Sequence, residues 1–257
     1  MFIHFYTTKY FCVYKKEPNY YNGAMKKNII IPIVIGAIVL TTAGGAIAFS
    51  LIKIKEKQNR EKWEEIFKQH YEDRVNLFIE ENKTAKDIDV VFLGDSLTEG
   101  YDVHKFYPEF NVLNRGIGGD TTFGVEKRLK ESVYDAHPKL TTMLIGANNF
   151  DTMFENYENI LKSFKEQAPN MKVVLLSLTS MTKEWGRNNQ KAIKNNEKIK
   201  EYANEYEFTF VDLYTPLLDE NTNELKEEYT IDGGHLTKEG YTVVTNTVSP
   251  VLHQLLD

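Results

Sequence analysis

The 257-residue sequence predicts an α/β domain built on a parallel sheet and preceded by a hydrophobic segment. Two observations predict this class. From residue 87 onward, short apolar runs alternate with amphipathic stretches of 12 to 19 residues, the pattern of βαβ units. The apolar content is 42%, with 15 Phe and 15 Tyr, which is enough to fill a core and excludes a disordered chain.

The charge of the chain is unevenly distributed. Residues 58–257 hold 23 Lys and Arg against 35 Asp and Glu, whereas residues 1–57 are basic. So acidic a surface repels phosphate backbones, and the composition therefore argues against nucleic-acid binding. The single cysteine, Cys12, excludes an intramolecular disulfide and a cysteine metal cluster.

Residues 29–52 form a candidate membrane segment, because they carry no charged residue over 24 positions. About 20 such residues span a bilayer, and a core helix of this length is disfavoured so close to the N-terminus. We expect an uncleaved, single-pass anchor at the cell membrane, with the rest of the chain extracellular. The alternative is a signal segment cleaved near Ala48 and a secreted protein, since Ala46-Ile47-Ala48 fits a cleavage site.

Residues 1–28 form an N-terminal segment, and residues 1–24 of it show no helix or strand periodicity. Met25-Lys26-Lys27 is typical of the start of an export segment, so a start at Met25 would leave residues 1–24 untranslated. Lys and Arg residues flank the hydrophobic segment on both sides. The positive-inside rule therefore leaves the orientation in the membrane open.

Residues 53–86 alternate charged residues with apolar ones at helical spacing. We expect an amphipathic helix, either a free stalk or a helix packed on the domain that follows, and its aromatic residues favour packing. His70 lies on the apolar face and is expected to be packed or half-exposed. That face consists of Trp63, Ile66, Phe67, His70, Tyr71, Val75, Phe78 and Ile79.

Residues 87–257 form the predicted α/β domain. We expect five short strands rich in apolar residues, with four helices and one polar loop between and after them. The strands are residues 90–93, 111–114, 140–145, 172–178 and 208–213; the helices are residues 123–134, 153–167, 188–206 and 237–256; the loop is residues 217–230.

The first strand, residues 90–93, ends at Gly94-Asp95-Ser96, so a serine follows the carboxyl end of a strand buried on both faces. Ligands bind just beyond that end in open α/β sheets, which makes Ser96 a candidate nucleophile. Asp-Ser after a strand is also common helix-capping chemistry. On this stretch alone, capping is the favoured interpretation.

Two further strands end in turns rich in glycine and asparagine, at residues 116–119 and 146–149. Glycines let a backbone N–H approach a ligand, and an asparagine side chain adds a neutral donor, as an oxyanion hole requires. The first turn differs from a dinucleotide fingerprint, because Thr121 and Thr122 occupy the place of its third glycine. Turns without a ligand remain the alternative for both segments.

Near the C-terminus, Asp232-Gly233-Gly234-His235 places an acid three positions before a histidine, with two glycines that permit a tight loop. The carboxylate can then orient the imidazole and stabilise its protonated form. Of the six histidines, only His235 has such a partner in a predicted loop. By itself, the motif is a weak signal.

Together, four blocks between residues 90 and 240 resemble the SGNH hydrolases of the GDSL esterase/lipase superfamily. The second and third blocks are most similar to the platelet-activating-factor acetylhydrolase-like branch, and the whole chain resembles a membrane-anchored bacterial type. The resemblance implies a three-layer α/β/α sandwich with a flavodoxin-like, five-stranded parallel sheet. Asn149 departs from the broad pattern, which has Asp there, but this branch tolerates Asn. The blocks are Gly94-Asp95-Ser96-Leu97, Asn114 to Thr122, Gly146-Ala147-Asn148-Asn149 and Asp232-x-x-His235.

The resemblance implies a role for five residues. Ser96 corresponds to the nucleophile, His235 to the base and Asp232 to the acid that orients the base. The backbone N–H groups of Ser96 and Gly119 and the side chain of Asn148 correspond to the oxyanion hole. This set implies a serine esterase that cleaves carboxylic esters through an acyl-serine intermediate, with no metal and no cofactor.

The substrate is predicted only as a class. A membrane segment favours esters at the cell envelope, namely lysophospholipids, short acyl esters or O-acetylated glycans. Apolar residues near the predicted site either line an acyl pocket or pack the loops, and packing is favoured. Trp185 lies in a polar run and is expected to be an exposed substrate contact. These apolar residues are Tyr101, Phe106, Tyr107, Met181 and Trp185.

Two other functions stay open at this point. One is a membrane-tethered, non-catalytic module that binds a wall polymer, against which the intact set of five site residues argues. The other is an acyltransferase that forms the same acyl-enzyme and differs only in the acceptor.

Overall fold

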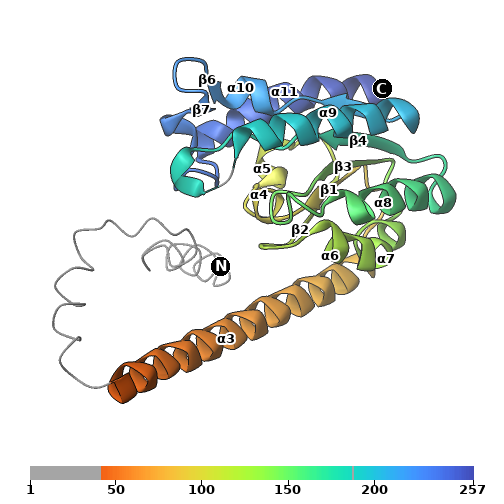
Figure 1. Ribbon diagram of the computed structural model, residues 1–257. Helices are drawn as coiled ribbons and strands as arrows, with labels where there is room; N and C mark the ends of the chain where they lie inside the picture. The colour runs from red at the N-terminus through yellow and green to blue at the C-terminus, as the bar shows by residue number, and fades with distance from the viewer. Residues whose placement is uncertain (1–41, 187) are drawn as a thin grey trace. The chain divides into compact units, whose positions relative to one another are not determined.

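The computed structural model describes residues 42–186 and 188–257 (Figure 1). The chain divides into two compact units, residues 1–66 and residues 67–257. The predicted N-terminal segment and residues 29–41 of the predicted membrane segment lie outside the described residues. Within the described ranges, no helix is long and apolar enough to cross a membrane.

Helix α3 (Thr42–Asn82) contributes to both units. Its part in the first unit carries exposed ion pairs between residues three or four positions apart, such as Lys53 with Glu56, and such pairs stabilise a solvated helix. From Phe67 onward it belongs to the second unit, and there Phe78 is fully buried. The aromatic face of this part therefore packs on the α/β domain, as predicted.

The second unit is built around a five-stranded parallel sheet. The strand order is β2-β1-β3-β4-β5, which is the flavodoxin-like order that the resemblance implied. Figure 1 labels four neighbouring strands of this sheet, β2, β1, β3 and β4. The strands are β1 (Val90–Gly94), β2 (Val112–Gly116), β3 (Leu140–Leu144), β4 (Lys172–Leu176) and β5 (Thr209–Val211).

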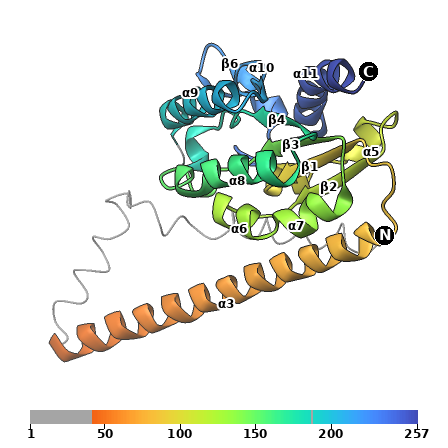
Figure 2. The ribbon, with the colours of Figure 1, turned by 90° about the vertical axis from the view of Figure 1, so that its right-hand side faces the viewer.

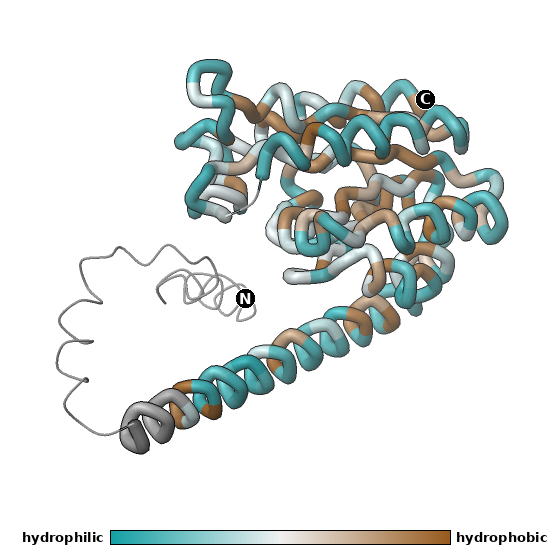
Figure 3. The backbone as a smooth tube through the Cα atoms, in the orientation of Figure 1, coloured by the Kyte–Doolittle hydropathy of each residue, from teal (hydrophilic) through white to brown (hydrophobic). Residues whose placement is uncertain are grey.

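Helices cover both faces of the sheet, which makes three layers (Figure 2). Residues of β1 alternate between the two cores, with Val91 and Leu93 on one side and Val90 and Phe92 on the other, because side chains alternate along a strand. Figure 3 shows hydrophobic residues concentrated in the central strands and hydrophilic ones on the outer helix surfaces. The first core is covered by α6 (Thr122–Lys127), α7 (Leu129–Ser132), α8 (Phe154–Gln167) and α9 (Asn189–Glu205), and the second by α4 (Ser96–Glu99), α5 (Val103–Phe106), α10 (Tyr214–Leu217) and α11 (Lys238–Leu256).

Several elements differ from the predictions, among them the short helices α4, α5 and α10, which were not predicted. The helix expected at residues 123–134 is divided into α6 and α7 at Arg128, whose φ of −114° and ψ of 16° leave the helical range. The polar loop expected at residues 217–230 contains a small antiparallel hairpin of β6 (Leu218–Asp219) and β7 (Glu224–Leu225). Single turns of 3-10 helix complete the domain, at η1 (Tyr134–Ala136), η2 (Lys183–Trp185) and η3 (Glu227–Tyr229).

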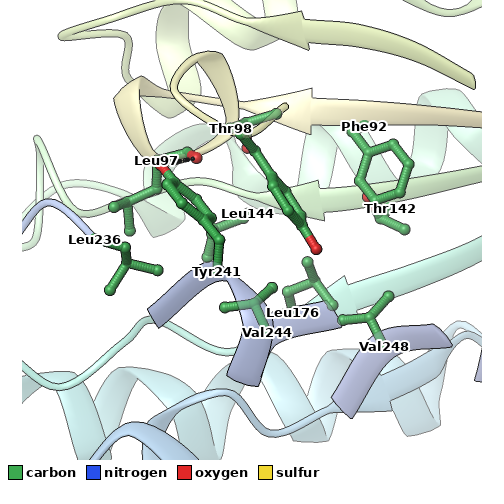
Figure 4. A pocket seen from close by; sticks show the side chains of 11 residues that line it. Phe92, Leu97, Thr98, Thr142, Leu144, Leu176, Leu236, Tyr241, Val244 and Val248 are labelled. Atoms are coloured by element: carbon green, nitrogen blue, oxygen red, sulfur yellow. Dashed lines mark hydrogen bonds between the residues drawn. The ribbon is translucent and has the colours of Figure 1, made fainter. Parts of the chain in front are cut away.

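A small apolar cavity of about 20 Å³ lies between the sheet and α11 (Figure 4). Leu97 and Leu236, the chain neighbours of Ser96 and His235, are among the side chains that line it. The volume is about that of one water molecule and is far too small for an acyl chain. Tyr101 also lines it and is buried, so the tyrosine packs the core as the favoured interpretation predicted.

Candidate active site

The carboxyl ends of β1, β2 and β3 meet at one edge of the sheet. Gly94, the last residue of β1, is level with Gly116 on β2 and with Leu144 on β3. Ser96 follows Gly94 by two residues, and the two predicted turns directly follow the other strands. Parallel pairing therefore gathers three of the four blocks at the edge where ligands bind in this fold class.

Ser96 and His235 are hydrogen-bonded although they lie 139 positions apart in the chain. Ser96 Oγ is 3.0 Å from His235 Nε2, and His235 Nδ1 is 2.8 Å from Oδ2 of Asp232. A carboxylate only accepts, so Nδ1 donates to Asp232 and Nε2 of the neutral ring accepts from the serine hydroxyl. The side chains of His235 and Asp232 are 16% and 15% exposed, which leaves the bonded groups shielded but reachable.

Asp95 performs the capping that the Asp-Ser pair also predicted. It is the N-cap of α4, and its Oδ1 accepts the backbone N–H of Leu97 at 3.1 Å. The cap fixes the first turn of α4, which begins at Ser96. Capping and presentation of the serine are therefore both features of the same turn.

Local hydrogen bonds hold the Asp232–His235 loop. Asp232 Oδ1 accepts the backbone N–H groups of Gly234 at 3.1 Å and His235 at 2.9 Å. The Thr230 hydroxyl donates to the carbonyl of His235 and accepts from the N–H of Gly233. Burial raises the pKa of Asp232, but the hydrogen bonds from the His235 side chain and the backbone outweigh it, and the pKa lies below its usual range. Asp232 is therefore ionised and orients the imidazole.

Trp185 packs against this loop from the segment after β4. The Trp185 and His235 rings are 4.8 Å apart and nearly perpendicular, at 88°. A Cβ placed on Gly234 would come within 2.4 Å of the indole, so a glycine is required for this contact. The predicted exposure of Trp185 is corrected here, because the residue is half-buried against the loop; its contact with substrate stays a prediction.

The turns that follow β2 and β3 are joined to each other. The Asn148 side chain donates to the carbonyl of Asp120 at 2.8 Å. The side-chain amide of the next residue, Asn149, donates to the Thr122 hydroxyl at 2.9 Å. These bonds place the Asn148 amide beside the turn that holds Gly119.

Arg128 anchors the first of these turns from inside the domain. Its side chain is 1% exposed, and its Nε lies 2.8 Å from Oδ2 of Asp120. Its two terminal nitrogens donate to the carbonyls of Arg115 and Gly94, both at 2.9 Å. Burial raises the pKa of Asp120, and the charge of Arg128 opposes that rise. One buried cation thus binds the ends of β1 and β2 together with the turn, which explains why the helix is interrupted at Arg128.

Gly119 is exposed at the tip of that turn, with a φ of +79°. This is the left-handed region, where a residue with a side chain is strained. A Cβ at Gly119 would also lie 3.2 Å from the ring of Phe67 on α3. Both observations explain why a glycine occupies this position.

The structure therefore brings the five predicted site residues to one region. Ser96, His235 and Asp232 are connected by direct hydrogen bonds. Gly119 and Asn148 lie on the two joined turns at the same sheet edge. Within the described part of the chain, no group of three or more His, Cys, Asp or Glu is placed to hold a metal ion.

Sequence reasoning missed the side chains that support these loops. Two signals were available: Glu99 lies one helical turn after Ser96, and Arg74 lies one helical turn after His70 in a predicted helix. Neither signal identifies the residue that each side chain contacts, because these contacts join segments that are distant in the sequence. His70 is half-exposed, as predicted. The missed residues are Arg74, Glu99, Arg128 and, in their actual contacts only, His70 and Trp185.

Residues 92–243 match the model of the GDSL-like lipase/acylhydrolase family. The matched span contains all five predicted site residues and covers more than half of the chain. The chain belongs to this family, and it is a carboxylic ester hydrolase. The resemblance stated from the four sequence blocks is thereby confirmed.

Relatives and solved structures of several organisms are similar to the chain. Platelet-activating factor acetylhydrolase IB subunit alpha2 of Homo sapiens is 28% identical over 191 residues, which cover 67% of this chain and 79% of that protein. A structure described as a platelet activating factor from Streptococcus pneumoniae has 25% identity and a TM-score of 0.72, and covers 76% of this chain and 99% of that one. An acylhydrolase of Bacteroides fragilis has 28% identity and a TM-score of 0.63, with 70% and 96% covered.

Proposed function

We propose that the chain is a serine esterase that cleaves carboxylic esters through an acyl-enzyme on Ser96. The observation that carries this proposal is the continuous hydrogen-bonded path from Ser96 Oγ through His235 to Asp232, with distances of 3.0 and 2.8 Å. A nucleophile bonded to a base, which is itself oriented by a third group, is the arrangement that activates a serine.

In the first step, Ser96 Oγ attacks the ester carbonyl carbon while His235 Nε2 takes the hydroxyl proton. The carbonyl electron pair moves onto its oxygen, and Asp232 stabilises the imidazolium that has formed. The backbone N–H groups of Ser96 and Gly119 and the side-chain N–H of Asn148 donate to the new oxyanion. Such preorganised donors are each worth about 10²–10³ in turnover.

In the second half of the reaction, the oxyanion reforms the carbonyl and the bond to the leaving alkoxide breaks. His235 donates its proton to that oxygen, so the alcohol leaves neutral and an acyl-Ser96 ester remains. Water then attacks this ester while His235 accepts its proton, and collapse releases the acid and returns the proton to Ser96 Oγ.

The proposed substrates are lipid or O-acetylated glycan esters at the cell envelope. Large apolar side chains are exposed beside the site: Phe67 contacts Gly119, Phe123 follows the same turn and Ile231 precedes Asp232. An exposed apolar rim around a nucleophile suits an apolar substrate group. This observation favours a lysophospholipid within the proposed class.

The uncharged residues 29–52 support a single-pass membrane anchor with the hydrolase domain outside the cell. A membrane-bound enzyme meets lipid and wall esters directly, which agrees with the proposed substrates. Secretion after cleavage near Ala48 is the alternative, and the N-terminal residue of the mature protein distinguishes the two.

The test is labelling of the full-length chain, purified in detergent, with a fluorophosphonate probe. We expect one adduct, mapped to Ser96 by mass spectrometry, and none in Ser96→Ala or His235→Ala. His253→Ala is the matched control, since His253 lies on the C-terminal helix and pairs with Glu109. Folded protein without label would contradict the proposal and favour the wall-binding module.

A substrate series then separates the proposed classes. Turnover of lysophosphatidylcholine, p-nitrophenyl acetate and an O-acetylated glycan is compared at equal enzyme concentration, and we expect the lysophospholipid to give the highest kcat/KM. Added alcohols test for acyl transfer. Release of free acid at the full rate supports a hydrolase, whereas preferential transfer to the alcohol would show an acyltransferase.

A further inference from the structure

The turn that holds Gly119 rests on α3, the helix that precedes the α/β domain in the chain. Arg74 donates its Nε and Nη2 groups to the carbonyl of Gly116, at 3.1 and 2.8 Å. The Phe67 ring lies against Gly119. These α3 residues belong to the same compact unit as the sheet. Part of α3 therefore covers the edge strand β2 and the turn that follows it.

Glu99 stands at the centre of these contacts. It is the last residue of α4, which begins at Ser96. Its Oε2 accepts the backbone N–H of Gly118 at 2.5 Å and the Nε2–H of His70 at 3.0 Å. Its Oε1 lies 3.7 Å from Nε of Arg74. One carboxylate thus joins the serine helix, the glycine turn and α3.

The bond to Gly118 fixes the backbone immediately before the proposed oxyanion donor. The N–H of Gly119 belongs to the next peptide unit, and neither glycine has a side chain of its own to hold that unit in place. Asn148 holds the other side of the turn through the carbonyl of Asp120. A donor that is already oriented lowers the barrier more than one that must be ordered during the reaction.

The charge of Glu99 requires compensation at this place. A carboxylate behind the turn opposes the formation of a nearby oxyanion unless positive charge neutralises it. Burial raises the pKa of Glu99, whose side chain is 13% exposed. The hydrogen bond from His70, the positive charge of Arg74 and the hydrogen bond from the Gly118 N–H outweigh burial, and the pKa of Glu99 lies below its usual range. The His70 hydrogen bond and the Arg74 charge therefore keep Glu99 ionised, and the Arg74 charge offsets that of the carboxylate.

We propose that Glu99 and His70 position the oxyanion hole. Glu99 accepts the N–H of Gly118 and so fixes the peptide unit directly before the one that carries the Gly119 donor, while His70 holds Glu99 in place from α3. This inference rests on the proposed function, because it assigns a task to the turn only if an oxyanion forms there. Both residues are positioning residues, since they act through the turn rather than on the substrate. The part of α3 from Phe67 onward then supports the active site.

The test uses the full-length chain in detergent with Glu99→Ala, Glu99→Gln and His70→Ala. Each variant is assayed for kcat and KM with p-nitrophenyl acetate. It is also assayed for the inhibition constant of an aryl trifluoromethyl ketone, which adds to a serine and places an oxyanion in the hole. We expect Glu99→Ala to lower kcat about 100-fold, as loss of one donor does, with KM within about 3-fold. The inhibition constant rises by the same factor as kcat/KM falls.

The remaining variants separate positioning from simple stability. Glu99→Gln keeps an acceptor oxygen for Gly118, so we expect a loss of about 10-fold, smaller than that of Glu99→Ala. His70→Ala lowers kcat about 10-fold in the parent, but changes nothing further in Glu99→Ala, because it acts through Glu99. Glu72→Ala is the matched control, since Glu72 forms an exposed pair with Lys68 on the same helix. It should leave kcat and the inhibition constant unchanged.

Two failures are distinguishable. A parent enzyme that labels at Ser96, together with Glu99 and His70 variants of parental kcat and inhibition constant, overturns this inference and leaves the proposed function intact. A fall in kcat without a matching rise in the inhibition constant overturns it as well. A parent that neither labels nor hydrolyses esters shows instead that the proposed function is wrong. If Glu99→Ala does not fold, Glu99→Gln and His70→Ala carry the same comparison.

Discussion

The two halves of the candidate site are held in opposite ways. The Asp232–His235 loop is held mainly by bonds within itself and from Thr230, all within five positions, with one longer-range bond from the Thr182 N–H to the Gly233 carbonyl. The Gly116–Asp120 turn is held from 28 and 42 positions away, by Asn148 and Arg74. The difference follows from chemistry. An acid and a histidine can orient each other, whereas a backbone donor between glycines has no side chain and depends on distant ones.

The largest effect is expected from a substitution in the locally held part of the site, the Asp232–His235 loop. Asp232→Asn keeps the shape of the side chain but removes its charge and favours the wrong imidazole tautomer, so we expect kcat to fall on the order of 10³–10⁴-fold. Steady-state kinetics with p-nitrophenyl acetate measure it. Asp219→Asn in the β6–β7 hairpin, outside the candidate site, is the control. An Asp232→Asn enzyme with more than about a tenth of parental kcat would contradict the assigned orientation.

The next largest effect is expected on protein stability, from a substitution that removes the anchor of the Gly116–Asp120 turn. Arg128→Met leaves the buried Asp120 carboxylate without its partner and removes donors from the Gly94 and Arg115 carbonyls. We expect a loss of about 3–5 kcal/mol in the free energy of unfolding, measured in urea. Lys130→Met, which removes an exposed ion pair with Asp135, should have no measurable effect. A loss for Arg128→Met as small as that of the control would show that the anchor is dispensable.

A smaller effect tests the turn itself. Gly119→Ala places a Cβ at a φ of +79° and 3.2 Å from the Phe67 ring. The left-handed backbone costs about 1–2 kcal/mol, and the strain displaces the proposed N–H donor. We expect kcat to fall about 10-fold or more. The double variant Gly119→Ala with Phe67→Ala should recover part of that loss, and identical kcat in the single and double variants would contradict the steric contact.

The smallest effect is in the acid stability of the α3 contact. The pKa of Glu99 is lower in the folded protein than the value of 4.5 expected when unfolded. The contribution of ionised Glu99 to the free energy of unfolding is therefore complete above pH 4.5. It is lost as the pH falls through the pKa of the folded protein. We expect Glu99→Gln to be less stable than the parent near neutral pH, with the difference shrinking below about pH 4.5. Denaturant unfolding between neutral and acid pH measures it, and a difference independent of pH would refute the depressed pKa.

The predictable part of this site was the part encoded locally. The apolar runs identified the strands, and parallel pairing then required their carboxyl ends to share one edge, which brought Ser96 beside the two turns. The spacing of Asp232 and His235 indicated their hydrogen bond, which the structure contains at 2.8 Å. In each case, neighbouring residues or a general rule of sheet topology carried the information.

The unpredicted part depends on contacts between distant segments. Helical periodicity runs through residues 123–134, and nothing there shows that Arg128 turns inward to bind carbonyls at the ends of β1 and β2. The interruption of the helix follows from that tertiary contact. In the same way, the apolar face of α3 predicted packing, but not that His70 meets Glu99 across 29 positions. Packing decides such pairs after the elements form.

The most direct test of the account is the structure of the full-length protein bearing a phosphonate on Ser96. A phosphonyl group places an oxygen where the oxyanion of the ester reaction forms. The account predicts that this oxygen lies about 2.7–3.1 Å from the backbone nitrogens of Ser96 and Gly119 and from Nδ2 of Asn148, with His235 still bonded to Asp232. An adduct on another residue, or a phosphonyl oxygen directed away from Gly119 and Asn148, would contradict it.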